Sequence, residues 1–212
     1  MNNSQVSRDI VQALLKIEAI KLSPEKPFTW SSGWKSPIYC DNRLSLSFPE
    51  IRTLVKDSLA ERIKENYPDA ESITGVATAG IPQGALVADL LGLPFIYVRS
   101  KAKGHGMENL IEGQAVKGQK TVVIEDLIST GGSSLKAVEA LRQGDIEVLG
   151  LGAIFTYGFA LADQNFTEAK VDYFTLSNYS TMLEEALQSN YINETQLETL
   201  KEWNRDPGNW GK

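Results

Sequence analysis

The stretch TVVIEDLISTGGSS, from Thr121 to Ser134, decides the fold of this chain. An apolar run leads into two adjacent acids, and a turn rich in serine, threonine and glycine follows. A buried strand, such a turn and a helix start together form an anion site, because backbone N–H groups converge there and the helix dipole adds roughly half a positive charge. Glu125 and Asp126 repel an anion, so they are expected to address another part of the same ligand.

The composition of the chain excludes several classes of protein. Its net charge of −6 gives no general attraction to nucleic acid, so we expect no nucleic-acid partner. Cys40 is the only cysteine, which rules out an internal disulfide, is compatible with a reducing cytosol and leads us to expect a cytoplasmic protein. Apolar runs such as VLGLGAIF are far too short to span a membrane, so we expect no membrane partner.

Strand and helix patterns alternate from residue 72 onward. Strands are predicted at SITGVAT, PFIYV, TVVIE, EVLGLGAIF and VDYFTL. Helical patterns separate most of these runs, which predicts an α/β fold with a mostly parallel central sheet flanked by helices. Residues 23–47 are predicted to be irregular because prolines and a glycine interrupt them. Ligands of such sheets bind beyond the carboxyl ends of the strands, which points to the TAGIP turn, to residues 99–118 and to the opening stretch.

A strip of cations follows one predicted strand. Arg99, Lys101, Lys103 and His105 occupy alternate positions, so an extended segment would place all four on one face. A solvated basic loop is the simpler alternative for such a run. The loop begins where ligand-binding loops begin, however, and long loops of this kind often act as lids. We therefore interpret it as a candidate lid.

Three motifs together resemble one known family. VVIEDLISTGG resembles the signature with which type I phosphoribosyltransferases bind phosphoribosyl pyrophosphate (PRPP). The pattern R-x-K-x-K-x-H-G resembles the mobile catalytic loop of orotate phosphoribosyltransferase, and FTWSSGWKSPIYCDNR resembles the hood segment of that family. The resemblance implies a type I phosphoribosyltransferase fold in a single domain with a small N-terminal hood. The hood is expected at roughly residues 1–47 plus C-terminal segments, and the core at roughly residues 48–176.

The activity that this resemblance implies is transfer of the 5-phosphoribosyl group from PRPP to orotate, giving orotidine 5′-monophosphate and pyrophosphate in pyrimidine (UMP) biosynthesis. The resemblance also implies Mg²⁺ as cofactor, held mainly by PRPP, with Asp126 nearby and no protein ligand assigned with certainty. Because the loop of this family reaches into the neighbouring subunit's site, a homodimer with shared active sites is implied as well.

The resemblance further assigns roles to residues of this sequence. Catalytic roles fall to Arg99, Lys103, His105 and Asp126. PRPP would be bound by Arg99, Lys101, Lys103, His105, Glu125, Asp126, Leu127, Ile128, Ser129, Thr130, Gly131, Gly132 and Ser133. Within that set the two acids would face the ribose hydroxyls, and the turn after Ser129 would hold the 5′-phosphate. Orotate would be bound by Ser129, Lys35, Tyr39 and Cys40, with Tyr39 offering a stacking surface.

The sequence departs from the best-known, enterobacterial-type pattern of the family at three places. Ser31 and Ala79 stand where that pattern has lysines, and the stretch AIFTY at residues 153–157 stands where it has an arginine for orotate. Lys35, Arg43 or backbone N–H groups of the TAGIP turn are the candidate replacements.

Three alternatives to an orotate enzyme remain at this level. A purine phosphoribosyltransferase shares the PRPP motif, but the hood segment argues against it. A non-catalytic regulator that senses nucleotides is disfavoured by the acidic balance of the chain and by the intact cationic loop, since a sensor needs no clamp for a leaving group. A generic α/β domain with an accidental motif is disfavoured by three motifs in family order.

Overall fold

A computed structural model describes residues 3–30, 33–101 and 110–211. The chain divides into two compact units, of which the larger is Thr53–Leu176. The smaller unit combines Met1–Arg52 with Ser177–Lys212, so it contains both ends of the chain.

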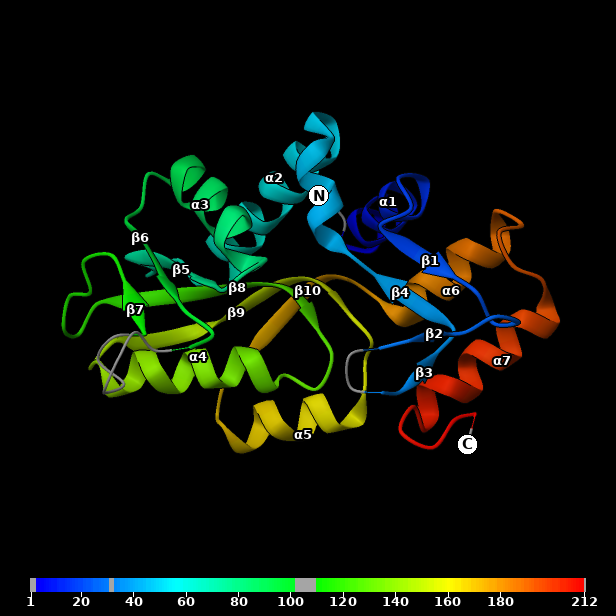
Figure 1. Ribbon diagram of the computed structural model, residues 1–212. Helices are drawn as coiled ribbons and strands as arrows, with labels where there is room; N and C mark the ends of the chain where they lie inside the picture. The colour runs from blue at the N-terminus through cyan, green and yellow to red at the C-terminus, as the bar shows by residue number, and fades with distance from the viewer. Residues whose placement is uncertain (1–2, 31–32, 102–109, 212) are drawn as a thin grey trace. The chain divides into compact units, whose positions relative to one another are not determined.

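The central sheet belongs to the larger unit and, in the described part of the chain, has the strand order β10-β9-β8-β5-β6-β7 (Figure 1). The strands are β5 (Ser72–Val76), β6 (Phe95–Val98), β7 (Ile111–Glu112), β8 (Lys120–Ile128), β9 (Glu147–Thr156) and β10 (Tyr173–Asn178). β5 pairs in parallel with β6 and β8, and β8 pairs in parallel with β9. β7 is antiparallel to β6. The predicted mostly parallel sheet is confirmed.

Helices cover both faces of this sheet. They are α2 (Pro49–Asn66), α3 (Gly80–Leu91), α4 (Gly132–Gln143) and α5 (Ala160–Glu168). α3 lies on one face of the sheet, and α4 and α5 lie on the other (Figure 1). α3 ends at Leu91, because Gly92 adopts a left-handed φ of 66° and its N–H donates to the carbonyl oxygens of Ala88 and Asp89.

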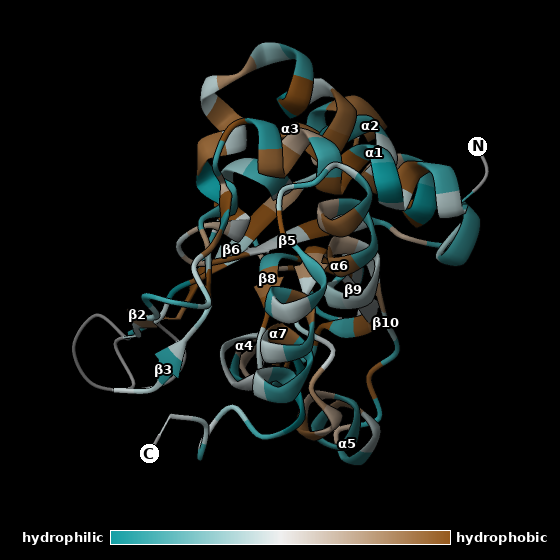
Figure 2. Cartoon of the chain, turned by 90° about the vertical axis from the view of Figure 1, so that its right-hand side faces the viewer, coloured by the Kyte–Doolittle hydropathy of each residue, from teal (hydrophilic) through white to brown (hydrophobic). Residues whose placement is uncertain are grey.

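The strands at the centre of the sheet are buried on both faces. All five residues of β5 are buried, as are Val122, Val123 and Ile124 of β8. Helices on both faces leave no solvated side for polar residues, so these strands read as continuous apolar runs. Each large aliphatic side chain removed from water contributes about 1.5–3 kcal/mol to folding. Figure 2 shows both hydrophobic and hydrophilic residues along α3, as expected for a helix with one face on the sheet.

β8 is longer than the sequence predicts. The ladder with β9 continues to the pair Ile128–Thr156, and Glu125 lies opposite Ala153. Asp126, Leu127 and Ile128 therefore lie within the strand, rather than after it. Pairing with β9, which is ten residues long, supplies hydrogen bonds that override the turn preference of the polar residues. Cross-strand pairing of this kind leaves no local trace in the sequence.

The smaller unit combines helices with short strand pairs. Its elements are α1 (Asn3–Lys16), β1 (Ile20–Leu22), β2 (Phe28–Thr29), β3 (Lys35–Ser36), β4 (Ile38–Cys40), the 3₁₀ helix η1 (Asn42–Ser47), α6 (Tyr179–Gln188) and α7 (Glu194–Arg205). β1 pairs with β4 and β2 pairs with β3, both antiparallel. Residues 23–47 were predicted to be irregular, and this prediction is wrong for β2, β3, β4 and η1. Strands of two or three residues are too short to show an alternating pattern.

Aromatic residues contribute to the core of the smaller unit. Trp203 is fully buried, its Nε1 donates to the carbonyl oxygen of Lys35 at 3.1 Å, and its ring meets Trp30 edge-on at 5.5 Å between centroids. α7 begins at a capping box formed by Asn193 and Gln196. Among the helices of the described ranges, none combines the length and the apolar character that a membrane span requires.

Candidate active site

The predicted ligand-binding loops begin at one edge of the sheet. Parallel pairing places Gly75 of β5 beside Ile124 of β8, and the N–H of Ala77 donates to the carbonyl oxygen of Val98 at 2.9 Å. The N–H of Arg99 donates to the carbonyl oxygen of Leu110 at 2.8 Å, so the segment that leaves β6 returns beside its starting point. The carboxyl ends of β5, β6 and β8 therefore deliver the TAGIP turn, the basic loop and the acid pair to the same edge.

The TAGIP turn packs directly against β8. α3 begins at Gly80, and a Cβ on this residue would overlap the carbonyl oxygen of Ile124 and lie 3.3 Å from the Cα of Glu125. Only glycine permits this approach between backbones. The peptide bond between Ala77 and Thr78, immediately before the turn, is cis. The turn thus lies beside the acid pair.

The two acids differ in their surroundings. The side chain of Glu125 is 5% exposed, whereas Asp126 is half-buried. Oε1 of Glu125 accepts the N–H of Asp126 at 3.0 Å, and Oε2 accepts the hydroxyls of Ser133 at 3.4 Å and Ser134 at 3.3 Å. Burial, with a further contribution from the charge of Asp126, raises the pKa of Glu125 to about 8. Without a ligand, Glu125 is therefore mostly protonated at neutral pH.

The glycine-rich turn connects this acid pair to α4. Gly131 is the N-cap residue of α4, with φ 80° and no hydrogen bond from a capping side chain. Gly132 and Ser133 are exposed, and Ser129 and Thr130 are half-buried. Leu127 is half-buried and Ile128 is fully buried, so these two residues contribute packing and backbone groups. A helix start that lacks a side-chain cap and whose first two residues are exposed is able to receive an anion.

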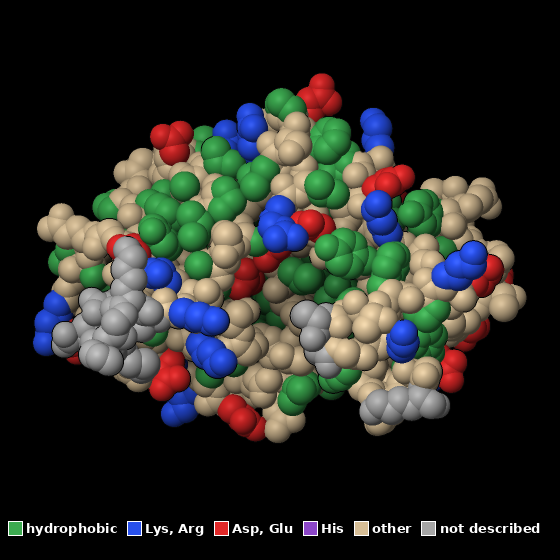
Figure 3. Space-filling view, in the orientation of Figure 1, with side chains coloured by type: hydrophobic (Ala, Val, Ile, Leu, Met, Phe, Trp, Pro, Cys, Tyr) green, Lys and Arg blue, Asp and Glu red, His purple; other side chains and the backbone are tan. Residues whose placement is uncertain are grey.

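Only part of the cationic strip lies in the described residues. Arg99 is half-buried, and its Nη1 lies 3.2 Å from Oε1 of Glu112 on β7. Lys101 is exposed. Lys103 and His105 lie outside the described residues. Figure 3 shows Lys and Arg side chains interspersed with Asp and Glu side chains on the face drawn, so an anion site there depends on local groups.

Comparison with known proteins identifies the family. A model of the phosphoribosyl transferase domain matches residues 46–186. Orotate phosphoribosyltransferase from Cytophaga hutchinsonii is 60% identical over 206 residues, which cover 97% of this chain and 99% of that protein. The protein of the same name from Porphyromonas gingivalis is 57% identical, covering 95% of this chain and 96% of its own length. The chain belongs to the orotate phosphoribosyltransferase family.

A solved structure agrees with this assignment to the orotate phosphoribosyltransferase family. The crystal structure of orotate phosphoribosyltransferase from Aeropyrum pernix matches with a TM-score of 0.76 and 29% identity, over 87% of this chain and 99% of that chain. The type I phosphoribosyltransferase fold implied by the three motifs is therefore confirmed.

The candidate orotate residues are divided between the two units. Ser129 belongs to the larger unit, and Lys35, Tyr39 and Cys40 belong to the smaller one. Nζ of Lys35 donates to Oγ1 of Thr29 at 2.9 Å. The side chain of Tyr39 is 41% exposed, which leaves ring surface for stacking. Cys40 is half-buried, and its Sγ donates to the Oδ1 of Asn42 at 3.3 Å.

The three departures from the enterobacterial-type pattern have different outcomes. Ala79 is the N-cap residue of α3, at the TAGIP turn. All five residues from 153 to 157 are buried, so this stretch packs inside the protein and offers no exposed donor for orotate. Ser31 lies outside the described residues.

Sequence reasoning missed two residues that support the site. Ser134 is fully buried and bonds to Glu125, which its position in the first turn of a predicted helix did not reveal. Asn165 on α5 donates from Nδ2 to the carbonyl oxygen of Thr130 at 2.8 Å. Because 35 residues separate Asn165 from Thr130, no local pattern indicates this bond.

Proposed function

We propose that this chain transfers the 5-phosphoribosyl group from PRPP to orotate, giving orotidine 5′-monophosphate and pyrophosphate. The observation that carries the proposal is the placement of Glu125 and Asp126 beside the uncapped start of α4, at the same edge as the TAGIP turn. A ligand that carries hydroxyls next to a phosphate would contact the acids with its hydroxyls and the start of α4 with its phosphate. The high identity to proteins named orotate phosphoribosyltransferase supports orotate as the acceptor.

In this proposal each end of PRPP meets a different part of the site. The 5′-phosphate accepts N–H groups at the start of α4 and hydroxyls of Thr130 and Ser133. The ribose hydroxyls donate to the carboxylates of Asp126 and Glu125. During transfer the bond from C1′ to pyrophosphate breaks, a bond from C1′ to a ring nitrogen of orotate forms, and the proton of that nitrogen is released to solvent. The adjacent carboxylates stabilise the positive charge that develops on the ribosyl group.

The cationic loop serves the leaving group. Arg99, Lys103 and His105 contact the pyrophosphate in the proposal, and Lys101 adds a further positive charge. Arg99 forms an ion pair with Glu112 at the start of the loop. In the proposal, Arg99 releases Glu112 when it binds the pyrophosphate. Closure of the loop also excludes water, which would otherwise capture the ribosyl cation.

Mg²⁺ is proposed as the cofactor. Within the ranges that the structure describes, no group of three or more His, Cys, Asp or Glu residues is arranged to hold a metal. Mg²⁺ is commonly held through one or two carboxylates and the phosphates of a substrate. The half-buried carboxylate of Asp126 fits that arrangement, with most ligands supplied by PRPP. When bound, the ion would neutralise charge on the pyrophosphate.

A cytoplasmic homodimer active in pyrimidine (UMP) biosynthesis is proposed as the working form. The support for shared active sites is the family resemblance of the loop from Arg99 to Gly106. If the loop serves the partner's site, mixing Lys103→Ala and Asp126→Asn subunits restores about a quarter of wild-type activity on statistical exchange, because half of the dimers hold one intact site. Absence of recovery after verified subunit exchange would contradict the shared site.

The reaction itself is tested with purified protein, PRPP and Mg²⁺. Orotate, adenine, guanine and hypoxanthine are compared as acceptors by measuring pyrophosphate release. Turnover is expected with orotate, and the purine bases are expected to react at least about a hundredfold more slowly. A pocket that forms hydrogen bonds to one base leaves its own polar groups unpaired when another base binds. Asp126→Asn serves as the impaired control. No turnover with orotate would overturn the proposal.

A further inference from the structure

The orientation of the phosphate turn depends on a carbonyl group held by α5. Nδ2 of Asn165 donates to the carbonyl oxygen of Thr130 at 2.8 Å. The peptide bond that follows joins this carbonyl to the N–H of Gly131, and in a trans peptide the C=O and the N–H point in opposite directions. Fixing the carbonyl of Thr130 toward α5 therefore aims the N–H of Gly131 away from α5.

The next residue of α5 supports the same turn by contact. Phe166 is 1% exposed, and a Cβ on Gly131 would lie 2.6 Å from its ring. The Cα of Gly131 therefore packs directly against this ring. The pair Asn165–Phe166 thus holds two successive residues of the turn, one by a hydrogen bond and one by packing.

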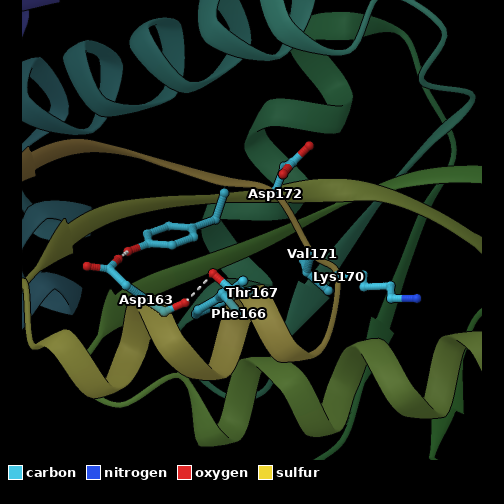
Figure 4. Close-up of a pocket in the computed structure, with 7 residues that line it drawn as sticks. Asp163, Phe166, Thr167, Lys170, Val171 and Asp172 are labelled. Atoms are coloured by element: carbon cyan, nitrogen blue, oxygen red, sulfur yellow. Dashed lines mark hydrogen bonds between the residues drawn. The ribbon is translucent and has the colours of Figure 1, made fainter.

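α5 is itself fixed on the side away from the turn. The ring of Phe166 packs against Tyr173 at 4.4 Å between centroids, and the hydroxyl of Tyr173 donates to the carboxylate of Asp163. Asp163, Phe166 and Lys170 line a pocket of about 360 Å³. Figure 4 shows Asp163 and Phe166 along α5, with the side chain of Lys170 pointing away from them. The hydrogen bond between Tyr173 and Asp163 joins α5 to β10.

The end of α5 is held by α4. Arg142, in the last turn of α4, donates to the carbonyl oxygens of Ala169 at 2.8 Å and Lys170 at 3.0 Å. Contacts with β10 and with α4 thus hold α5 at two points, and Asn165 donates to the carbonyl of Thr130 from between them.

We propose that Asn165 is a positioning residue for PRPP, which acts by holding the carbonyl of Thr130 so that the Gly131 amide faces the 5′-phosphate. The inference rests on the proposed function, since it takes the turn after Ser129 as the phosphate site. Asn165 touches neither substrate in this proposal. Its contribution is to fix the Gly131 amide before PRPP binds, so that binding loses less free energy to ordering of the turn.

The test uses Asn165→Ala and Asn165→Asp in the full chain. Either change is expected to raise the KM for PRPP about five- to tenfold while kcat at saturating PRPP and the KM for orotate stay within about twofold, because one hydrogen bond that acts on binding is lost. The inhibition constant of inorganic phosphate against PRPP is expected to rise in parallel. Gln164→Ala is the matched control, since Gln164 is the exposed neighbour of Asn165 and its side-chain amide donates to Glu168 on the same helix.

The outcomes separate the inference from the function on which it rests. Equal KM values for PRPP in Asn165→Ala and Gln164→Ala would overturn the positioning role while leaving the enzyme intact. A fall in kcat with unchanged KM for PRPP would also overturn it. A loss of thermal stability without a change in the inhibition constant of phosphate would assign Asn165 a structural role only. If the wild type itself neither turns over orotate nor binds PRPP, the proposed function fails first.

Discussion

Oγ of Ser134 lies 3.3 Å from Oε2 of Glu125, and both side chains are buried. The first turn of α4 thereby supplies a hydrogen bond to the acid that precedes the phosphate turn. The other oxygen of Glu125 accepts the N–H of Asp126. The carboxyl group thus accepts hydrogen bonds at both oxygens, and burial nevertheless raises its pKa to about 8. Two predictions follow from the protonated form of this acid.

The first prediction concerns the pH dependence of stability. The pKa of Glu125 is higher in the folded chain than in the unfolded one, where it is 4.5. Its contribution to the free energy of unfolding is therefore fully present below about pH 4.5 and is lost as pH rises through about 8. Glu125→Gln is expected to stabilise the ligand-free protein above about pH 8 by several kcal/mol, at most about 5. Urea unfolding at about pH 5.5 and about pH 8.5 measures the difference.

The control for this prediction is Glu139→Gln, on the exposed face of α4. It is expected to leave the difference in stability between the two pH values as it is in the wild type. If Glu125→Gln gives the wild-type difference as well, Glu125 is ionised in the ligand-free protein, and the account of its burial is wrong.

The second prediction concerns proton release on binding. If the ribose hydroxyls require the carboxylate form of Glu125, PRPP binding at about pH 7 releases close to one proton from this site, because a group with a pKa near 8 is mostly protonated there. Titration calorimetry in two buffers of different ionisation enthalpy measures the number of protons. Glu125→Gln is expected to release about one proton fewer than the wild type. Equal release by the two proteins would exclude a change of charge at Glu125.

Gly131 is predicted to resist substitution for two independent reasons. Its φ of 80° is unfavourable for a residue with a side chain, and an added Cβ would lie 2.6 Å from the ring of Phe166. Gly131→Ala is expected to lower the free energy of unfolding by roughly 2–4 kcal/mol, combining left-handed strain with overpacking. Thermal and urea unfolding measure this change.

The neighbouring glycine provides the matched comparison. A Cβ on Gly132 would meet only Oγ1 of Thr130, at 3.9 Å, and Gly132 has an ordinary φ. Gly132→Ala is expected to change stability by less than about 1 kcal/mol, since alanine is also the better helix former. Similar losses for the two variants would show that the contact with Phe166 does not limit the turn.

The parts of the fold that could be predicted are those whose residues are consecutive in the sequence. The strand, the turn and the helix around Glu125 and Gly131 are consecutive in sequence, so the local pattern was sufficient. The added length of β8, by contrast, depends on pairing with β9, and the need for glycine at residue 80 depends on the backbone of Ile124. These features arise only when distant segments meet.

The support of the phosphate turn shows the same limit at the candidate site. Asn165 and Phe166 occupy one helix of ordinary composition, and nothing in α5 distinguishes them from their neighbours. Their importance follows from the position of Thr130 and Gly131, which lie 35 residues earlier in the chain. A hydrogen bond from a side chain to a backbone carbonyl also requires no particular residue at the accepting position, so a sequence motif records only one partner.

The last prediction concerns Lys103, which lies outside the described residues and whose assignment depends on the loop motif. Lys103→Ala is expected to lower kcat by about a hundredfold or more, because a positive charge aimed at the leaving pyrophosphate acts mainly in the transition state. Thermal stability and affinity for PRPP stay close to wild type if the loop is only a lid. Lys117→Ala is the control, since Lys117 is exposed and pairs with Asp145 at 2.8 Å. A Lys103→Ala variant that turns over as fast as Lys117→Ala would remove Lys103 from the catalytic set and would favour an enzyme that does not need this lysine to bind the leaving group.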